Sequence, residues 1–246
     1  DVRKTLTPQL RADQGDTDLI LIDLGQGNNR LAGSALAQVY KQVGCTPPDL
    51  DSPALLRAFF TAMQELHMSG SLLAYHDRSD GGLFVTVCEM AFAGHTGVTL
   101  ALGTLGTDAA AALFAEELGA VLQVRRSEKQ SVLDTLKNHG LEAGVHVIVS
   151  PNADEITVNG QLALSETRVD LQRAWSETTC RMQALRDNPD CAREEFDGLL
   201  DVADKGIHPV VRFDINDDVA APLIATGVRP QVAILREQGV NGQVEM

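Results

Sequence analysis

The chain contains 246 residues, of which 44% are hydrophobic and 22% are charged, and its formal net charge is −14. This length and hydrophobic content suffice for one large domain or two small ones with a proper core. The acidic balance argues against nucleic-acid binding and against an anionic membrane surface, because both need a basic face. No apolar run approaches the roughly 20 residues that cross a bilayer, and the first residues show no signal-peptide core. A cytoplasmic protein is therefore expected.

Residues 18–24 combine leucine and β-branched residues over the length of a strand, and a loop rich in glycine and asparagine follows at 25–29. A helix from about 33 to 43 is predicted after this loop. Gly25 and Gly27 form only part of a dinucleotide-binding fingerprint, because Arg30 stands where its third glycine would lie. Arg30 could hold an anion, although a solvated arginine is the more ordinary interpretation.

The pair Ser52 and Pro53 is typical of a helix start, with a capping serine and a proline in the first turn. The predicted helix runs to residue 67 and ends before Gly70. Its apolar residues fall on one face, which predicts ordinary packing against a core. They are Leu55, Phe59, Ala62, Met63 and Leu66.

The most informative segment is residues 71–83, where a strand at 71–75 leads into a polar loop that ends in two glycines and opens onto an apolar helix at 83–93. Unpaired N–H groups at a helix start attract anions, and glycines let a ligand approach the backbone. Asp77 and Asp80 supply the oxygen ligands that Mg²⁺ prefers, and Ser79 offers a hydroxyl to a phosphate. The segment therefore indicates a site for a phosphate and its metal.

An alternative interpretation of this loop is purely structural. Ser or Asp before a helix is commonly an N-cap, and Asp-Gly is commonly a turn. Against it, two carboxylates three residues apart repel unless a cation or water separates them. The local pattern leaves both interpretations open.

Strand and helix patterns alternate from Gly94 to residue 165 and end in a hairpin at 154–164, with Asn159-Gly160 as a two-residue turn. This alternation predicts a layered α/β domain over residues 1–165, and the hairpin makes its sheet mixed. The other predicted elements are strands at 97–102, 120–124 and 145–149 and helices at 108–118 and 127–138.

A helical and acidic connector is predicted over residues 166–228, with helices starting near Ser165 and at Asn188-Pro189. The side chains of Trp175, Met182 and Leu185 recur at helical spacing, so we expect them to dock on the main domain. The aspartates after residue 213 are interpreted as solvated and not as a metal site. Residues 229–236 resemble a buried strand, which predicts the truncated start of another domain at 229–246.

The cysteines and histidines show no metal-ligand spacing, so we assign them no chemistry. The cysteines are predicted to be free thiols, with Cys88 buried in an apolar helix. They are Cys45, Cys88, Cys180 and Cys191.

Four segments carry a resemblance to a known family. They are residues 24–31 (LGQGNNRL), 76–83 (HDRSDGGL), 114–119 (FAEELG) and 232–241 (VAILREQGVN). With them in this order, the whole chain closely resembles the C-terminal third of the large, single-chain phosphoribosylformylglycinamidine synthase, a glutamine amidotransferase and ATP-binding ligase of purine biosynthesis.

The resemblance implies a domain like the C-terminal domain of aminoimidazole ribonucleotide synthetase, followed by the connector and the start of a glutaminase domain. In the family, ATP activates the formyl amide oxygen of formylglycinamide ribonucleotide, and ammonia from glutamine displaces it to form formylglycinamidine ribonucleotide. The half that contains this chain resembles the one that keeps ATP or ADP with Mg²⁺ in a structural role. By this resemblance Asp77 is a Mg²⁺ ligand and Ser79 contacts the nucleotide, whereas Asp80 receives no role.

The glutaminase nucleophile of the family falls beyond Met246, so the fragment alone is expected to be inactive. Its expected partners are the remainder of the synthetase body and the glutaminase domain of the same polypeptide. A second hypothesis is a scaffolding and interface module without a nucleotide site, in which the loop at 77–82 is only a turn and cap.

Overall fold

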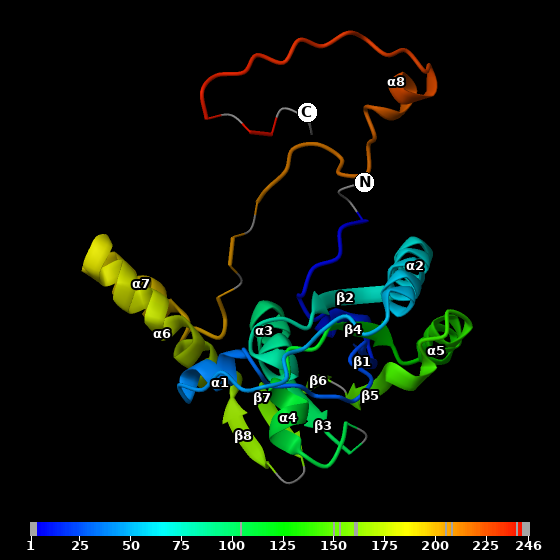
Figure 1. Cartoon of the computed structure of the whole chain (residues 1–246). Helices are drawn as coiled ribbons and strands as arrows, with labels where there is room; N and C mark the ends of the chain where they lie inside the picture. Colours follow the sequence, from blue (N-terminus) through cyan, green and yellow to red (C-terminus); the bar gives the residue numbers. More distant parts are fainter. Residues whose placement is uncertain are drawn as a thin grey trace. The chain divides into compact units, whose positions relative to one another are not determined.

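The protein is represented by a computed structural model in which the described residues are 4–103, 105–149, 151–152, 154–159, 162–204, 206–207, 209–239 and 241–242. The chain divides into two compact units, Asp1–Ala203 and Asp204–Met246. The first unit contains both β-sheets (Figure 1). Among the described residues, no helix is long and apolar enough to cross a membrane.

The first sheet is antiparallel throughout and has the strand order β2-β4-β1-β5. Its strands are β1 (Thr17–Asp23), β2 (Leu72–Asp77), β4 (Gly119–Arg125) and β5 (Val145–Val149). Central strand β1 is buried along its whole length, as its run of leucine and isoleucine predicts. Its register places Leu21 opposite Val121 of β4.

The side chains of β1 alternate between two cores, because successive residues of a strand point to opposite faces. Ile20 and Ile22 pack with helices α2 (Pro53–Ser69) and α5 (Lys129–Asn138) on one face. Leu19 and Leu21 pack on the other face with helix α3 (Gly82–Gly94) and with the second sheet. The first sheet is thus the middle layer of a layered domain (Figure 1).

The second sheet has the order β6-β3-β7-β8, with β3 and β7 parallel and its other pairs antiparallel. Its strands are β3 (Gly97–Ala101), β6 (Pro151–Asn152), β7 (Glu155–Asn159) and β8 (Leu164–Thr167). The predicted layered α/β fold with a mixed sheet is therefore confirmed.

The predicted two-residue turn of the hairpin is wrong. Val158 pairs with Leu164, so the second strand starts later than the sequence pattern indicates. Asn159 lies within β7 because it pairs with Ala101 of β3, and a residue held in a ladder cannot also be a turn residue. Gly160 and Gln161 lie outside the described residues.

Helices α2 and α3 match their predictions. Ser52 accepts the N–H of Leu55 as the N-cap of α2, and left-handed Gly70 ends the helix. Along α3 most residues are buried, as its nearly uniform apolar sequence predicts. Short 3₁₀ turns lie at η2 (Ala12–Gln14) and η3 (Glu142–Gly144).

Helices α1 (Ala35–Val39) and α4 (Ala109–Phe114) are shorter than predicted. Lys41 has a positive φ of 55°, which ends any helix extending through residue 43. Residues 115–118 leave the helix at Ala115, whose backbone is extended. The glutamates that follow it bind partners far away in the sequence, so tertiary contacts override their helix propensity.

The connector forms a helical hairpin of α6 (Arg168–Arg186) and α7 (Pro189–Gly198), with Asn188 capping α7 as predicted. The Arg173 guanidinium lies 3.9 Å from the centroid of the Phe196 ring. Trp175 reaches α3, where its ring centroid is 6.0 Å from that of Phe92 and its Nε1–H donates to Glu89 at 3.2 Å. The rest of the predicted docking stripe is wrong, because Met182 and Leu185 are 64% and 90% exposed.

The second unit contains helix α8 (Ala221–Ala225). Residues 229–236, predicted as a buried strand, are exposed and have no regular secondary structure. A strand needs a neighbour to satisfy its backbone N–H and C=O groups, and the described residues of this unit contain no other strand to pair with. Apolar content alone therefore does not make this segment a strand.

The four cysteines are free thiols, as predicted. Cys88 lies in α3 among core residues, and burial raises the pKa of its thiol to about 12. It is therefore a packing residue and not a reactive group at neutral pH.

The Asp18 carboxylate joins β1 to Lys129, the first residue of α5, and to Arg126 just before that helix. Lys129 Nζ lies 2.8 Å from one carboxylate oxygen and Arg126 Nη2 lies 3.2 Å from the other. Burial by itself would raise the pKa of Asp18, but hydrogen bonds from Lys129 and Arg126 outweigh it and leave that pKa below its ordinary value.

Replacement of Asp18 by Asn should lower the free energy of unfolding at pH 7 by about 1–2 kcal/mol. Because the folded-state pKa is depressed, the unfolded chain binds this proton first, and the stabilisation is lost as pH falls below about 4. Urea unfolding measured from pH 7 to pH 3 should show that the difference in free energy of unfolding between wild type and Asp18→Asn becomes smaller in acid. Asp134→Asn, on the exposed face of α5, is the control. A difference that stays constant down to pH 3 would contradict this assignment.

Candidate functional site

The candidate site is the loop between β2 and α3. Asp77 ends β2, and Asp77, Ser79 and Asp80 are all exposed. Arg78 lies between them with its side chain 1% exposed. Alternation along the extended chain therefore places Asp77 and Ser79 on the solvent side and Arg78 on the interior side.

The start of α3 is not capped by a side chain of its own loop, so the predicted Ser or Asp cap is wrong. Gly81 takes the N-cap position in a left-handed conformation, and its N–H donates to Glu116 Oε1 at 2.8 Å. The predicted turn is confirmed, because the N–H of Gly82 donates to the carbonyl of Ser79 at 2.9 Å. The loop is therefore a turn whose helix receives a carboxylate from elsewhere in the chain.

Glu116 also accepts the N–H of Ala35, the first residue of α1, at 2.8 Å. One carboxylate oxygen thus serves the starts of two helices, where the backbone is electropositive. Sequence reasoning missed this residue. The signal that could have pointed to it is its place in the segment 114–119 (FAEELG), which carries part of the family resemblance.

Asp77 accepts a hydrogen bond from the Tyr75 hydroxyl at 2.5 Å. Burial, together with this bond, raises the pKa of Tyr75 above its ordinary value. The described residues contain no group of three His, Cys, Asp or Glu side chains that could hold a metal. Mg²⁺ often takes one or two carboxylates together with phosphate oxygens and water, and Asp77 offers one exposed carboxylate.

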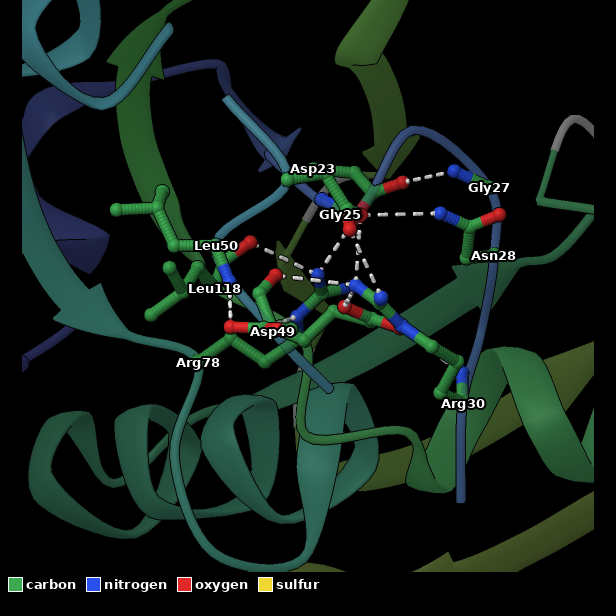
Figure 2. A network of polar contacts seen from close by, with 11 residues as sticks. Asp23, Gly25, Gly27, Asn28, Arg30, Asp49, Leu50, Arg78 and Leu118 are labelled. Atoms are coloured by element: carbon green, nitrogen blue, oxygen red, sulfur yellow. Dashed lines mark hydrogen bonds and ion pairs between the residues drawn. The ribbon is translucent and has the colours of Figure 1, made fainter. Parts of the chain in front are cut away.

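Arg78 anchors the loop from the inside (Figure 2). Its Nη2 donates to Asp23 Oδ1 at 2.5 Å and to the Leu118 carbonyl at 3.0 Å, and its Nε donates to the Glu117 carbonyl at 2.6 Å. Both members of the Arg78–Asp23 pair are almost fully buried. A buried ion pair with additional hydrogen bonds fixes the geometry of the groups that hold it.

The glycine loop closes around the same aspartate. Asp23 Oδ1 accepts the N–H of Gly25 at 3.0 Å, and Oδ2 accepts the N–H of Gly27 at 2.7 Å (Figure 2). These amides form the kind of anion-binding turn that could hold a phosphate, but here a carboxylate of the protein occupies it. The partial dinucleotide fingerprint is therefore an internal structural feature.

Arg30 is not the solvated residue that the ordinary interpretation suggested. Its Nε and Nη2 each lie 2.7 Å from an oxygen of Glu117, whose side chain is fully buried. The backbone N–H of Arg30 also donates to Glu117, and Asp51 binds the other edge of the guanidinium. The hydrogen bonds with Glu117, and then those with Asp51, raise the pKa of Arg30.

A cavity of about 200 Å³ lies beside this network and is lined in part by Asp23, Asn29, Arg78 and His146. Burial lowers the pKa of His146, Asp23 opposes this shift and Arg78 adds to it. The cavity therefore borders a nearly neutral set of groups, in which the charges of Asp23 and Arg78 offset each other.

Gly82 is required by the packing of the loop. Its φ is +69°, and an added Cβ would lie 2.7 Å from the Leu113 carbonyl oxygen. Gly82→Ala should therefore lower the free energy of unfolding by about 1–2 kcal/mol from backbone strain and about 1–3 kcal/mol more from overlap.

Gly140→Ala is the matched control, because Gly140 has a φ of +78° with nothing within 4 Å of an added Cβ. It should show the strain alone, at about 1–2 kcal/mol. Chemical denaturation of both variants measures the difference. Equal losses for the two alanines would mean that close approach to the 113–115 backbone is not what requires glycine at position 82.

Comparison with known proteins assigns the chain to a family. A family model described as "AIR synthase related protein, C-terminal domain" matches residues 18–149. The structure of PurLQS from Thermotoga maritima is similar with a TM-score of 0.52 and 11% identity, covering 98% of this chain and 33% of that chain. The structure of T. maritima PurL complexed with ATP has a TM-score of 0.51 and 12% identity, with the same coverage. At this identity the two structures establish a shared fold, and the chain spans about a third of their length. The family model covers more than half of the chain. The chain therefore belongs to the family of AIR synthase related proteins, and residues 18–149 form the C-terminal domain that this family model describes.

Proposed function

We propose that the chain is part of a phosphoribosylformylglycinamidine synthase, an ATP-dependent ligase that forms a C–N bond in purine biosynthesis. Membership of the AIR synthase related family supports this proposal. So does the likeness in fold to T. maritima PurL, one structure of which is complexed with ATP. The complete enzyme would convert formylglycinamide ribonucleotide to formylglycinamidine ribonucleotide with ammonia from glutamine, in the cytoplasm.

Within that enzyme we assign to this chain a structural site for Mg²⁺ with ATP or ADP, with Asp77 as a metal ligand and Ser79 as a nucleotide contact. The observation that carries this assignment is the outward placement of both side chains at the start of a helix without a cap from its own loop. The helix start favours negative charge, and Asp77 favours a cation beside it. When bound, Mg²⁺ would offset phosphate charge, while Ser79 and the backbone would orient the phosphates.

The remainder of the polypeptide, including the rest of the synthetase body and a glutaminase domain, would be the partner of this chain. The site at Asp77 would then support the architecture of the synthetase, and amidine formation would take place elsewhere. Replacing Asp77 should accordingly affect activity through stability and not through the chemical step.

A scaffolding module without a nucleotide is the second candidate. Two observations favour it: Glu116 already accepts the Gly81 N–H, and the described residues include no preformed cluster of metal ligands. The two candidates differ in whether the full-length protein retains Mg-nucleotide through purification.

Replacement of Asp77 by Asn should release the nucleotide from the full-length protein and lower its melting temperature. Losing a ligand present at about 100 times its dissociation constant withdraws about 2.7 kcal/mol from the folded state. Mass spectrometry of released nucleotide and thermal melts with and without Mg-ADP measure the two effects.

Two matched controls test whether Asp77 acts as a Mg²⁺ ligand or only supports the local structure of the loop. Tyr75→Phe removes the hydrogen bond to Asp77 but keeps its carboxylate, and Asp80→Asn removes one charge from the same exposed loop. Both controls should retain more nucleotide than Asp77→Asn. Wild-type protein without nucleotide, or undiminished nucleotide and melting temperature in Asp77→Asn, would favour the scaffold.

The isolated chain should release no glutamate from glutamine and form no amidine. By the family resemblance, the glutaminase nucleophile and the main ATP and substrate sites belong to other parts of the enzyme. An assay of glutamate release, with the full-length protein as positive control, tests this. Glutamine-dependent glutamate formation by the 246-residue chain would contradict the assignment.

A further inference from the structure

We infer that Arg78 is a positioning residue that holds Asp77 and Ser79 in place and mechanically couples their loop to the glycine loop at residues 25–30. The part that concerns the nucleotide rests on the proposed function. The coupling of the two loops rests on the contacts of Arg78, Asp23 and Glu117.

Arg78 is well placed for this role, because it lies between the two exposed residues and points into the protein. Its side chain is 1% exposed and donates to one carboxylate and two carbonyl oxygens. Since the backbone of residue 78 is shared with its neighbours, fixing this side chain limits the positions that Asp77 and Ser79 can take. A movement of about 1 Å in a positioned group is enough to weaken its interactions with a ligand strongly.

Two separate bridges join this anchor to the glycine loop. Asp23 binds Arg78 and also the amides of Gly25 and Gly27. The backbone carbonyl of Glu117 accepts a hydrogen bond from Arg78, and the side-chain carboxylate of Glu117 accepts hydrogen bonds from Arg30. The two ends of the glycine loop are therefore tied to the same guanidinium.

Close packing reinforces this coupling. A Cβ on Gly25 would lie 2.7 Å from the Glu117 side chain, so the glycine loop rests directly against the second bridge. A shift of either bridge would therefore act on the backbone of residues 25–30. Loosening Arg78 should consequently loosen both loops together.

Arginine is required because its planar fork carries donors in two directions, whereas a lysine ammonium is a point charge on a flexible stem. Arg78→Lys keeps the charge beside Asp23 but cannot reproduce the bonds to the Glu117 and Leu118 carbonyls at the same time. It is the conservative variant that separates positioning from charge.

Arg168→Lys is the matched control. Arg168, the first residue of α6, is another buried arginine, with its side chain 3% exposed, and it donates to Asp154 and Gln172. Its replacement should lower stability without acting on either loop. A purely structural role of Arg78 would make the two variants behave alike.

The experiment measures hydrogen exchange and Mg-ADP affinity of full-length wild type, Arg78→Lys and Arg168→Lys, at a temperature where all are folded. In Arg78→Lys the amides of residues 25–30 and 77–82 should exchange faster together, and the dissociation constant for Mg-ADP should rise about 10–100-fold. In Arg168→Lys the amides of residues 25–30 and 77–82 should exchange at wild-type rates, and the dissociation constant for Mg-ADP should stay at its wild-type value. If Arg78→Lys does not fold, Asp23→Asn serves in its place with the same paired acceleration expected.

Acceleration in one loop alone, or equal acceleration in Arg168→Lys, would overturn the coupling. Wild-type affinity for Mg-ADP in a folded Arg78→Lys would overturn the positioning role while leaving the proposed function intact. A wild type that binds no Mg-ADP but shows paired acceleration in Arg78→Lys would refute the proposed nucleotide site and support the coupling of the loops.

Discussion

The buried ion pair of Arg78 and Asp23 is the interaction on which the rest of the site depends. Asp23 ends the central strand β1, and Arg78 follows the end of the edge strand β2. A charge inside a protein is tolerated only when it is paired and hydrogen-bonded. Glycine amides complete the shell of Asp23, and backbone carbonyls complete that of Arg78. The loops at 25–30 and 77–82 take their shapes around this pair.

The two glutamates after α4 extend the same arrangement to the helices. Glu117 holds Arg30 from a fully buried position, and Glu116 serves the starts of α1 and α3. Residues 115–118, which are not helical, thus supply carboxylates that bind an arginine side chain and the free backbone N–H groups at two helix starts. Because Glu116 already accepts the Gly81 N–H at the start of α3, a nucleotide at this loop would depend largely on the exposed groups Asp77 and Ser79.

The layered fold explains how such a polar network stays in register. Sheet residues of β1 and β4 pack on both faces, with α2 and α5 on one side and α3 with the second sheet on the other. Asp23 and Arg78 are almost fully buried, and the lower dielectric of the interior strengthens their interaction. The network lies at the ends of β1 and β2, where the apolar layers meet the loops. The packing of the core therefore helps to fix the geometry of the site.

Elements whose patterns are complete within a short window can be predicted from the sequence alone. The cap at Ser52, the apolar helix α3, the buried strand β1 and the turn before Gly82 all follow from neighbouring residues. The other features depend on tertiary contacts, because Arg30, Glu116 and Glu117 have hydrogen-bond partners tens of residues away in the chain. The end of α4, the pairing of Val158 and the lack of a strand at 229–236 likewise depend on available neighbours. Hydrogen-bond partners that lie far apart in the chain leave no periodic signal, so only the folded structure reveals them.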